Sequence, residues 1–188
     1  MKHRYIGKTG LRVTPICLGT MGFGSWSDEK ESFKIMDKSV DFGINFFDTA
    51  EVYPIPPKAE YAGETESIIG RWLKGKQRDK FIIASKVAGA ANGWFVPPIR
   101  HGLTAIDKFH IKTAIEGSLK RLGTDYIDLY QMHWPDTLVP IEESLKAFDE
   151  LVQEGKVRYL GTSNDTAYGL TKANETSKRL GISRFESI

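Results

Sequence analysis

The 188-residue chain carries a net charge of +2, with 40% hydrophobic and 27% charged residues, a profile typical of one soluble domain with a buried core. It has no basic run, no apolar stretch near the ~20 residues that span a bilayer, and no secretory signal, so neither nucleic acid nor a membrane is expected as a partner. We expect one domain over residues 1–188. The single cysteine, Cys17, excludes an internal disulfide, and a cytoplasmic location is expected. Cys17 itself is expected to be a small core residue.

Short apolar runs alternate with helical periodicity along the whole chain. Residues 3–14 predict a β-hairpin around the turn GKTG. Strands are expected at about 16–18, 45–48, 81–85, 127–132, 157–161 and from 184 onward. Helices are expected at about 28–42, 64–74, 108–122, 140–154 and 167–180, because apolar residues recur there at helical spacing and a glycine follows each helix.

Polar residues follow three of the apolar runs. NFFD ends at Asp48, FIIASK ends at Lys86, and IDLYQMH ends at His133, while Tyr53 lies five residues after Asp48. Taken singly, an Asp after a strand is often a helix cap or turn residue, and a Tyr or His is often a packing residue. A lysine after so apolar a strand is rarer, because its amine needs a partner. The four together favour a functional site.

The alternation of strands and helices predicts parallel strands with helical crossovers. Two α/β architectures fit: an open doubly wound sheet, or a (β/α)8 TIM barrel with about six of its eight units. Polar groups at successive strand ends favour the barrel, in which every strand end faces one centre. We expect Phe46, Ile83 and Leu129 to point into that barrel.

Two loops are candidate ligand contacts. The first, GTMGFGSW at 19–26, allows close backbone approach to a ligand, although it does not match the G-x-G-x-x-G pattern of a dinucleotide-binding turn. A tight turn without a ligand is the alternative. The second loop, about 87–107, contains Trp94 and Phe95 and is long enough to form a wall over a pocket.

At this level of detail the chain resembles the aldo-keto reductase family. The resemblance rests on FGINFFDTAEVY, the lysine of ASK, SLKRLGTDYIDLYQMHWPD and EGKVRYLGTSN, and it covers nearly the whole sequence. The family's catalytic tetrad falls on Asp48, Tyr53, Lys86 and His133. It implies reduction of aldehydes or ketones with NADP(H), with NAD(H) as the alternative, and no metal.

The resemblance also implies roles for individual residues. Tyr53 would be the general acid, Lys86 would favour its phenolate form, Asp48 would hold Lys86, and His133 would bind the carbonyl oxygen. The cofactor would contact Asp48, Ser163, Asn164 and the loop residues Gly19, Thr20, Met21 and Gly22. An apolar substrate wall would include Trp26, Trp94 and Trp134, although each tryptophan is as readily explained by ordinary packing.

The resemblance leaves two further interpretations open. One is a catalytically impaired binding or regulatory protein of the same fold, similar to the potassium-channel β subunits. The other is a metal-dependent hydrolase in which Asp48 and His133 bind the metal. These two residues are the only ligand types expected at strand ends, which is too few for a dedicated metal site. Because a full family member has eight strands, we expect a chain of six to lack the adenosine-phosphate side of the cofactor site and to self-associate through open barrel edges.

Overall fold

The computed structural model describes residues 1–91 and 95–188. Its strands are β1 (Arg4–Tyr5), β2 (Arg12–Val13), β3 (Leu18–Gly19), β4 (Phe46–Asp48), β5 (Ile82–Val87), β6 (Ile127–Met132) and β7 (Val157–Thr162). Its α-helices are α1 (Glu29–Asp41), α2 (Glu64–Leu73), α3 (Lys108–Leu122), α4 (Ile141–Gln153) and α5 (Ala167–Leu180). Two short 3-10 turns span Arg78–Lys80 and Arg100–Gly102.

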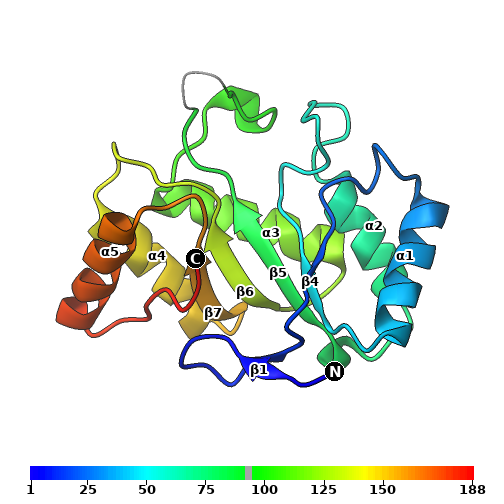
Figure 1. Ribbon diagram of the computed structural model, residues 1–188. Coiled ribbons are helices and arrows are strands. Elements are labelled where there is room, and N and C mark those ends of the chain that lie inside the picture. Colours follow the sequence, from blue (N-terminus) through cyan, green and yellow to red (C-terminus); the bar gives the residue numbers. More distant parts are fainter. Residues whose placement is uncertain (92–94) are drawn as a thin grey trace.

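The larger sheet is parallel and wound in one direction. Its strands lie side by side in chain order, β3-β4-β5-β6-β7. Helices connect successive strands and lie behind and beside the sheet in Figure 1. A doubly wound sheet would reverse its strand order at a switch point. The sequential order is instead that of a partial TIM barrel, as expected.

The predicted hairpin is present. Strands β1 and β2 pair antiparallel and lie below the amino ends of the parallel strands in Figure 1. Leu11 and Val13 are buried there against Ile82 and Leu129 of the sheet. The hairpin is also tied to β7, because the amide of Gly10 donates a 3.0 Å hydrogen bond to the hydroxyl of Tyr159. It therefore closes one end of the sheet's inner face.

Side chains alternate between the two faces of the sheet, as a strand requires. Phe47, Ile83 and Tyr130 pack in the main core toward the helices, whereas Phe46 and Leu129 pack with the hairpin on the inner face. The expectation that Ile83 points inward is therefore wrong. In β5 the positions 82, 84 and 86 take the inner face, so position 83 must take the other.

The sheet's margins differ most from the sequence-based expectation. The first strand begins two residues later than expected, at Leu18, and Cys17 is exposed, so the prediction that it is a core residue is wrong. Within the described residues β3 pairs only with β4, so it is an edge strand of this sheet. The expected last strand is reduced to a bridge between Leu160 and Phe185, which two backbone hydrogen bonds of 2.8 and 3.0 Å extend to residue 187.

The helices begin and end where side-chain chemistry predicts. The carboxylates of Asp28 and Asp107 accept hydrogen bonds from amides in the first turns of α1 and α3, and left-handed glycines follow α3 and α5. Pro140 precedes the first residue of α4. In the part of the chain that the structure describes, no helix has the length and hydrophobicity needed to cross a membrane.

Candidate active site

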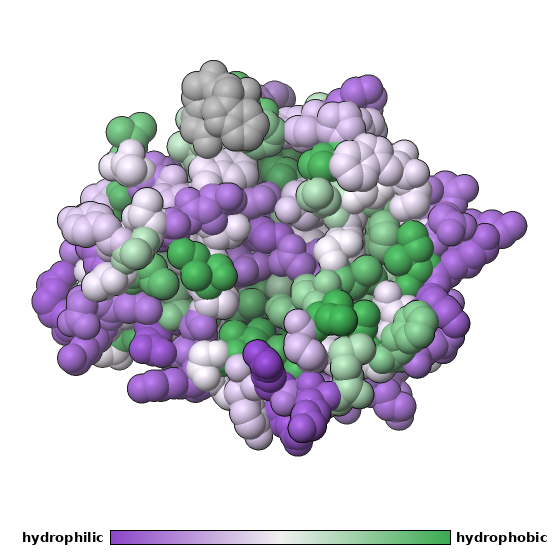
Figure 2. Space-filling view, in the orientation of Figure 1, coloured by the Kyte–Doolittle hydropathy of each residue, from purple (hydrophilic) through white to green (hydrophobic). Residues whose placement is uncertain are grey.

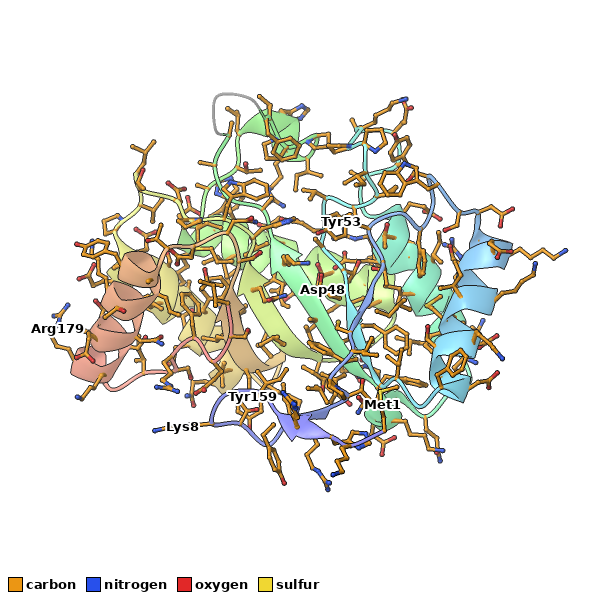
Figure 3. The ribbon with its side chains drawn as sticks, viewed as in Figure 1. Met1, Lys8, Asp48, Tyr53, Tyr159 and Arg179 are labelled. Atoms are coloured by element: carbon orange, nitrogen blue, oxygen red, sulfur yellow. The ribbon has the colours of Figure 1, made fainter. Side chains whose placement is uncertain are left out.

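The carboxyl ends of three parallel strands carry the predicted polar residues to one place. Asp48 is the last residue of β4, Lys86 lies near the end of β5, and His133 directly follows β6. Tyr53 comes from the loop after β4, and Figure 3 shows it just above Asp48 at the upper ends of the strands. Seen in Figure 2, the same face has hydrophilic side chains at its centre and hydrophobic ones around them. The structure thus brings the four predicted catalytic residues together.

Lys86 is the centre of this group. Its side chain is almost fully buried, and its ammonium contacts the carboxylate of Asp48, the backbone oxygen of Thr49 at 2.8 Å, and the hydroxyl of Tyr53 at 3.5 Å. A buried ammonium needs such partners to offset its desolvation. Lys86 therefore links the strand that carries Asp48 to the loop that carries Tyr53.

A fifth residue, Gln131, belongs to the group and was not predicted. Its side-chain amide donates a 3.1 Å hydrogen bond to Oδ2 of Asp48, while Lys86 contacts Oδ1. Gln131 lies on β6 beside Lys86 of β5 and Gly161 of β7. A β-carbon at Gly161 would lie 3.1 Å from Cγ of Gln131, so the glycine leaves room for it. Side chains on a strand alternate between its two faces, so Gln131 lies on the same face as His133, two residues later. This spacing is the sequence signal that could have indicated Gln131.

His133 is held as a neutral imidazole. Burial, and then the nearby charge of Lys86, lower its pKa from 6.5 to about 3. Its ring meets the ring of Tyr53 edge-on, with 5.6 Å between the centroids. Nδ1 has no hydrogen-bond partner in the described part of the chain. A neutral imidazole still has one N–H donor, so His133 can donate a hydrogen bond without carrying charge.

These residues open into a mostly apolar cavity of about 460 Å³. Its lining comprises Val52, Tyr53, Ile55, Pro57, Phe95, His133, Trp134, Pro135 and Asn164. Trp134 lines the cavity, and its ring packs edge-on against Phe95. Trp26 is 70% exposed and does not line the cavity. Trp94 lies outside the described residues.

The proline-rich loop after Tyr53 forms a wall that the sequence-based analysis did not assign. Ile55 and Pro57 line the cavity together with the aromatic residues. The amide of Ile55 donates a 2.9 Å hydrogen bond to the backbone oxygen of Met21, and its carbonyl accepts one from the hydroxyl of Ser25. The glycine-rich loop therefore supports this wall from outside the cavity.

The predicted cofactor contacts fall into two groups, one beside Asp48 and one beside His133. In the first, Gly19 is the strand partner of Asp48, and the buried hydroxyl of Thr20 donates to the Asp48 backbone oxygen at 2.7 Å. Met21 is exposed, and Gly22 accepts backbone hydrogen bonds within its turn. In the second group, Ser163 and Asn164 follow β7, and the Asn164 amide donates to the backbone oxygen of His133 at 2.8 Å.

Comparison with known proteins agrees with this geometry. A model of the Aldo/keto reductase family matches residues 15–185. The chain belongs to the aldo/keto reductase family. Among solved structures, the thermostable aldo-keto reductase Tm1743, bound to the inhibitor epalrestat, matches with a TM-score of 0.77 and 32% identity, over 94% of this chain and 58% of that one.

Curated relatives in the family are considerably longer than this chain. The uncharacterized oxidoreductase YrpG of Bacillus subtilis is 45% identical over 95% of the chain and 54% of its own length. Protein tas of Escherichia coli is 37% identical over 100% and 59%. Norsolorinic acid reductase B of Aspergillus parasiticus is 36% identical over 93% and 46%. This aldo/keto reductase chain thus spans about half the length of the relatives it matches.

Proposed function

We propose that the chain carries the catalytic residues of an oxidoreductase that reduces aldehyde or ketone carbonyls with NADP(H), with Tyr53 as the general acid. The observation that carries the proposal is the buried ammonium of Lys86 between the Asp48 carboxylate and the Tyr53 hydroxyl, beside a neutral His133. Of these groups, Tyr53 and His133 line an apolar cavity that suits an apolar carbonyl compound.

Tyr53 would protonate the carbonyl oxygen of the substrate as the carbon is reduced. A phenol is a weak acid at neutral pH, so the phenolate left behind needs stabilisation. The ammonium of Lys86, at 3.5 Å from the hydroxyl, supplies a positive charge for this purpose. Asp48 holds that ammonium in place from the other side.

His133 would orient the carbonyl and stabilise the negative charge that develops on its oxygen. Preorganised hydrogen-bond donors of this kind act strongly in a site that excludes water. With a pKa of about 3, His133 stays neutral at physiological pH and does not compete with Tyr53 as a proton donor. Its edge-on contact with the Tyr53 ring puts both groups beside the same part of the cavity.

Ser163 and Asn164, beside His133, offer hydrogen-bonding groups that suit a nicotinamide. The Asn164 amide nitrogen is engaged by His133 and Ser163, which leaves its oxygen to accept a hydrogen bond. The Ser163 hydroxyl accepts from that amide and can donate in turn. One acceptor and one donor complement the two ends of a carboxamide. A bound nicotinamide would supply the hydride, and NAD(H) is the alternative to NADP(H).

The relatives support the reaction class. One carries the printed name norsolorinic acid reductase, and one is called an oxidoreductase. The aromatic wall of Phe95 and Trp134 favours an aromatic or otherwise bulky apolar substrate for this chain. No observation favours a metal-dependent hydrolase: in the described part of the chain, no three His, Cys, Asp or Glu side chains are grouped to hold a metal ion.

The proposal is tested by following the absorbance of NADPH during incubation with an aromatic aldehyde, with and without a chelator. We expect NADPH oxidation that the chelator does not change. Loss of activity on chelation would contradict the proposed chemistry. NADPH binding without turnover would instead favour the regulatory or binding protein, and a titration followed by NADPH fluorescence separates that outcome from a failure to bind.

A further inference from the structure

Glu51 lies in the loop after β4, between Asp48 and Tyr53 in the sequence, and forms a buried ion pair that the proposed chemistry does not use. Its side chain is 3% exposed. Its two oxygens accept hydrogen bonds of 2.7 and 2.8 Å from the two terminal nitrogens of Arg100. Oε1 also accepts a 2.7 Å hydrogen bond from the amide of Ala88. This bidentate arrangement fixes orientation as well as distance.

The same residue joins the catalytic loop to the end of β5. The Glu51 amide donates to the backbone oxygen of Lys86 at 3.2 Å, so its main chain is bonded to one catalytic residue while its side chain is bonded two residues further along. Ala50, Val52 and Ala88 form a small buried cluster around this connection, and Tyr53 packs against it. A displacement of Glu51 would therefore shift Tyr53 and the start of the loop after β5.

Arg100 lies in the loop that follows β5, well after the start of this loop at Ala88, and its backbone has an unfavourable conformation. Arg100 and His101 have φ values of 48° and 56°, in the left-handed region that residues other than glycine rarely adopt. Such conformations persist where the surroundings hold them in place. The ion pair with Glu51 is the side-chain interaction that holds Arg100, and neighbouring Ile99 packs on the small cluster.

The loop that is held in this way builds the aromatic wall of the cavity. Phe95 packs edge-on against Trp134 at 5.4 Å between ring centroids, and both line the cavity. Trp134 is itself bonded to the loop through its Nε1, which donates to the backbone oxygen of Ala90 at 2.8 Å. A β-carbon at Gly89 would lie 2.7 Å from the Trp134 backbone oxygen. The wall therefore depends on how closely the loop approaches the strand ends.

We propose that the Glu51–Arg100 pair is a specificity-determining positioning element, which fixes the aromatic wall relative to Tyr53 and thereby selects bulky aromatic carbonyl substrates over small ones. This inference rests on the proposed reductase function for the substrate class. A purely structural pair would stabilise the fold without affecting the choice of substrate. Replacing both partners of a buried pair by apolar residues often costs little stability, whereas removing one partner destabilises the fold. Stability alone therefore does not separate the two roles, and selectivity of the folded variants is the property to measure.

The test compares Arg100→Met, which removes the charge and keeps most of the aliphatic body, with Arg100→Lys, which keeps the charge and loses the two-pronged geometry. Arg158→Met is the matched control, since Arg158 pairs with Asp128 through a 2.6 Å contact at the opposite end of the sheet. Each protein is assayed for kcat and KM with naphthaldehyde and with propanal. Binding of naphthoate is measured by calorimetry as a readout that needs no turnover.

We expect Arg100→Met to lower the kcat/KM preference for naphthaldehyde over propanal by about tenfold, within the range that lost pocket contacts produce. The change should appear mainly in KM, and naphthoate should bind more weakly by a similar factor. Arg100→Lys should fall between, and Arg158→Met should keep the preference and the naphthoate affinity. Should Arg100→Met fail to fold, Arg100→Lys and Glu51→Gln carry the comparison.

The possible results separate the two proposals. An unchanged preference and unchanged naphthoate binding in the folded Arg100 variants would overturn the positioning role while leaving the reductase function intact. Absence of turnover in every protein, combined with weakened naphthoate binding in the Arg100 variants alone, would overturn the reductase function and uphold the role of the pair in shaping the wall. A wild-type protein that neither discriminates nor binds naphthoate would overturn the inference.

Discussion

The side-chain amide of Gln131 donates a 3.1 Å hydrogen bond to the carboxylate oxygen of Asp48 that does not contact Lys86. Both oxygens of this carboxylate are thus engaged, one by a cation and one by a neutral donor. A carboxylate held from two sides has little freedom to rotate away from the ammonium. Gln131 is therefore a positioning residue for the proposed reaction, acting through Asp48 and Lys86 on Tyr53.

Replacing Gln131 by Leu should lower kcat about tenfold while changing KM little, because the loss of a supporting hydrogen bond typically costs about 1–3 kcal/mol when a polar partner is left behind. Steady-state kinetics with an aromatic aldehyde measure the effect. Gln153→Leu, at the exposed end of α4, is the control. Equal kinetics in the two variants would show that Gln131 does not support the catalytic group.

Replacing Tyr53 by Phe should abolish carbonyl reduction and leave NADPH binding nearly unchanged, because only the phenol hydroxyl is removed. Loss of a general acid typically costs about 10²–10⁴ in rate. Turnover and an NADPH titration are measured on the same preparation. The control is Tyr168→Phe, since Tyr168 is exposed on α5. Retention of turnover in Tyr53→Phe would show that another group donates the proton.

The depressed pKa of His133 predicts a specific loss of stability in acid. The unfolded chain binds a proton at this histidine below pH 6.5, whereas the folded chain binds it only near pH 3. Protonation therefore favours the unfolded state, and the contribution of His133 is present above pH 6.5 and lost as the pH falls toward 3. Each pH unit in this window should cost about 1.4 kcal/mol of unfolding free energy.

Urea unfolding of the wild type and of His133→Gln at pH 7.5 and pH 4.5 isolates this contribution. Carboxylates and the other histidines titrate in both proteins, so the difference between the two pH dependences belongs to His133. The wild type should lose more stability on acidification than the variant does. Parallel pH dependences in the two proteins would mean that His133 is not buried as a neutral imidazole.

We propose that the 188-residue chain associates with itself through the edge strand β3. Backbone groups of an edge strand are free to pair with another chain, and Ile16, Cys17 and Met21 next to this edge are exposed. Light scattering should show a mass that rises with protein concentration, and Ile16→Lys should reduce it. Leu138→Lys, in an exposed loop elsewhere, should not. A mass that stays monomeric at every concentration would contradict the proposal.

The sequence by itself determined the parts of the protein that depend on neighbouring residues. Glycines after each helix, the Asp28 cap and the apolar runs predict the elements closely, because caps and periodicity are local properties. The polar residues that end successive parallel strands also predict that Asp48, Lys86 and His133 meet. Their convergence follows from strand direction alone, since the carboxyl ends of parallel strands lie at one edge.

Only the tertiary structure decided what depends on packing between distant segments. Strand order distinguished a barrel from a doubly wound sheet, and pairing at the margin left Cys17 exposed instead of buried. The hydrogen bond from Gln131 to Asp48 depends on the order of the strands in the sheet. The ion pair between Arg100 and Glu51 depends on how the long loop after β5 folds back over the strand ends. Such contacts join residues tens of positions apart, and no local pattern specifies them, because each depends on a three-dimensional register set by the whole core.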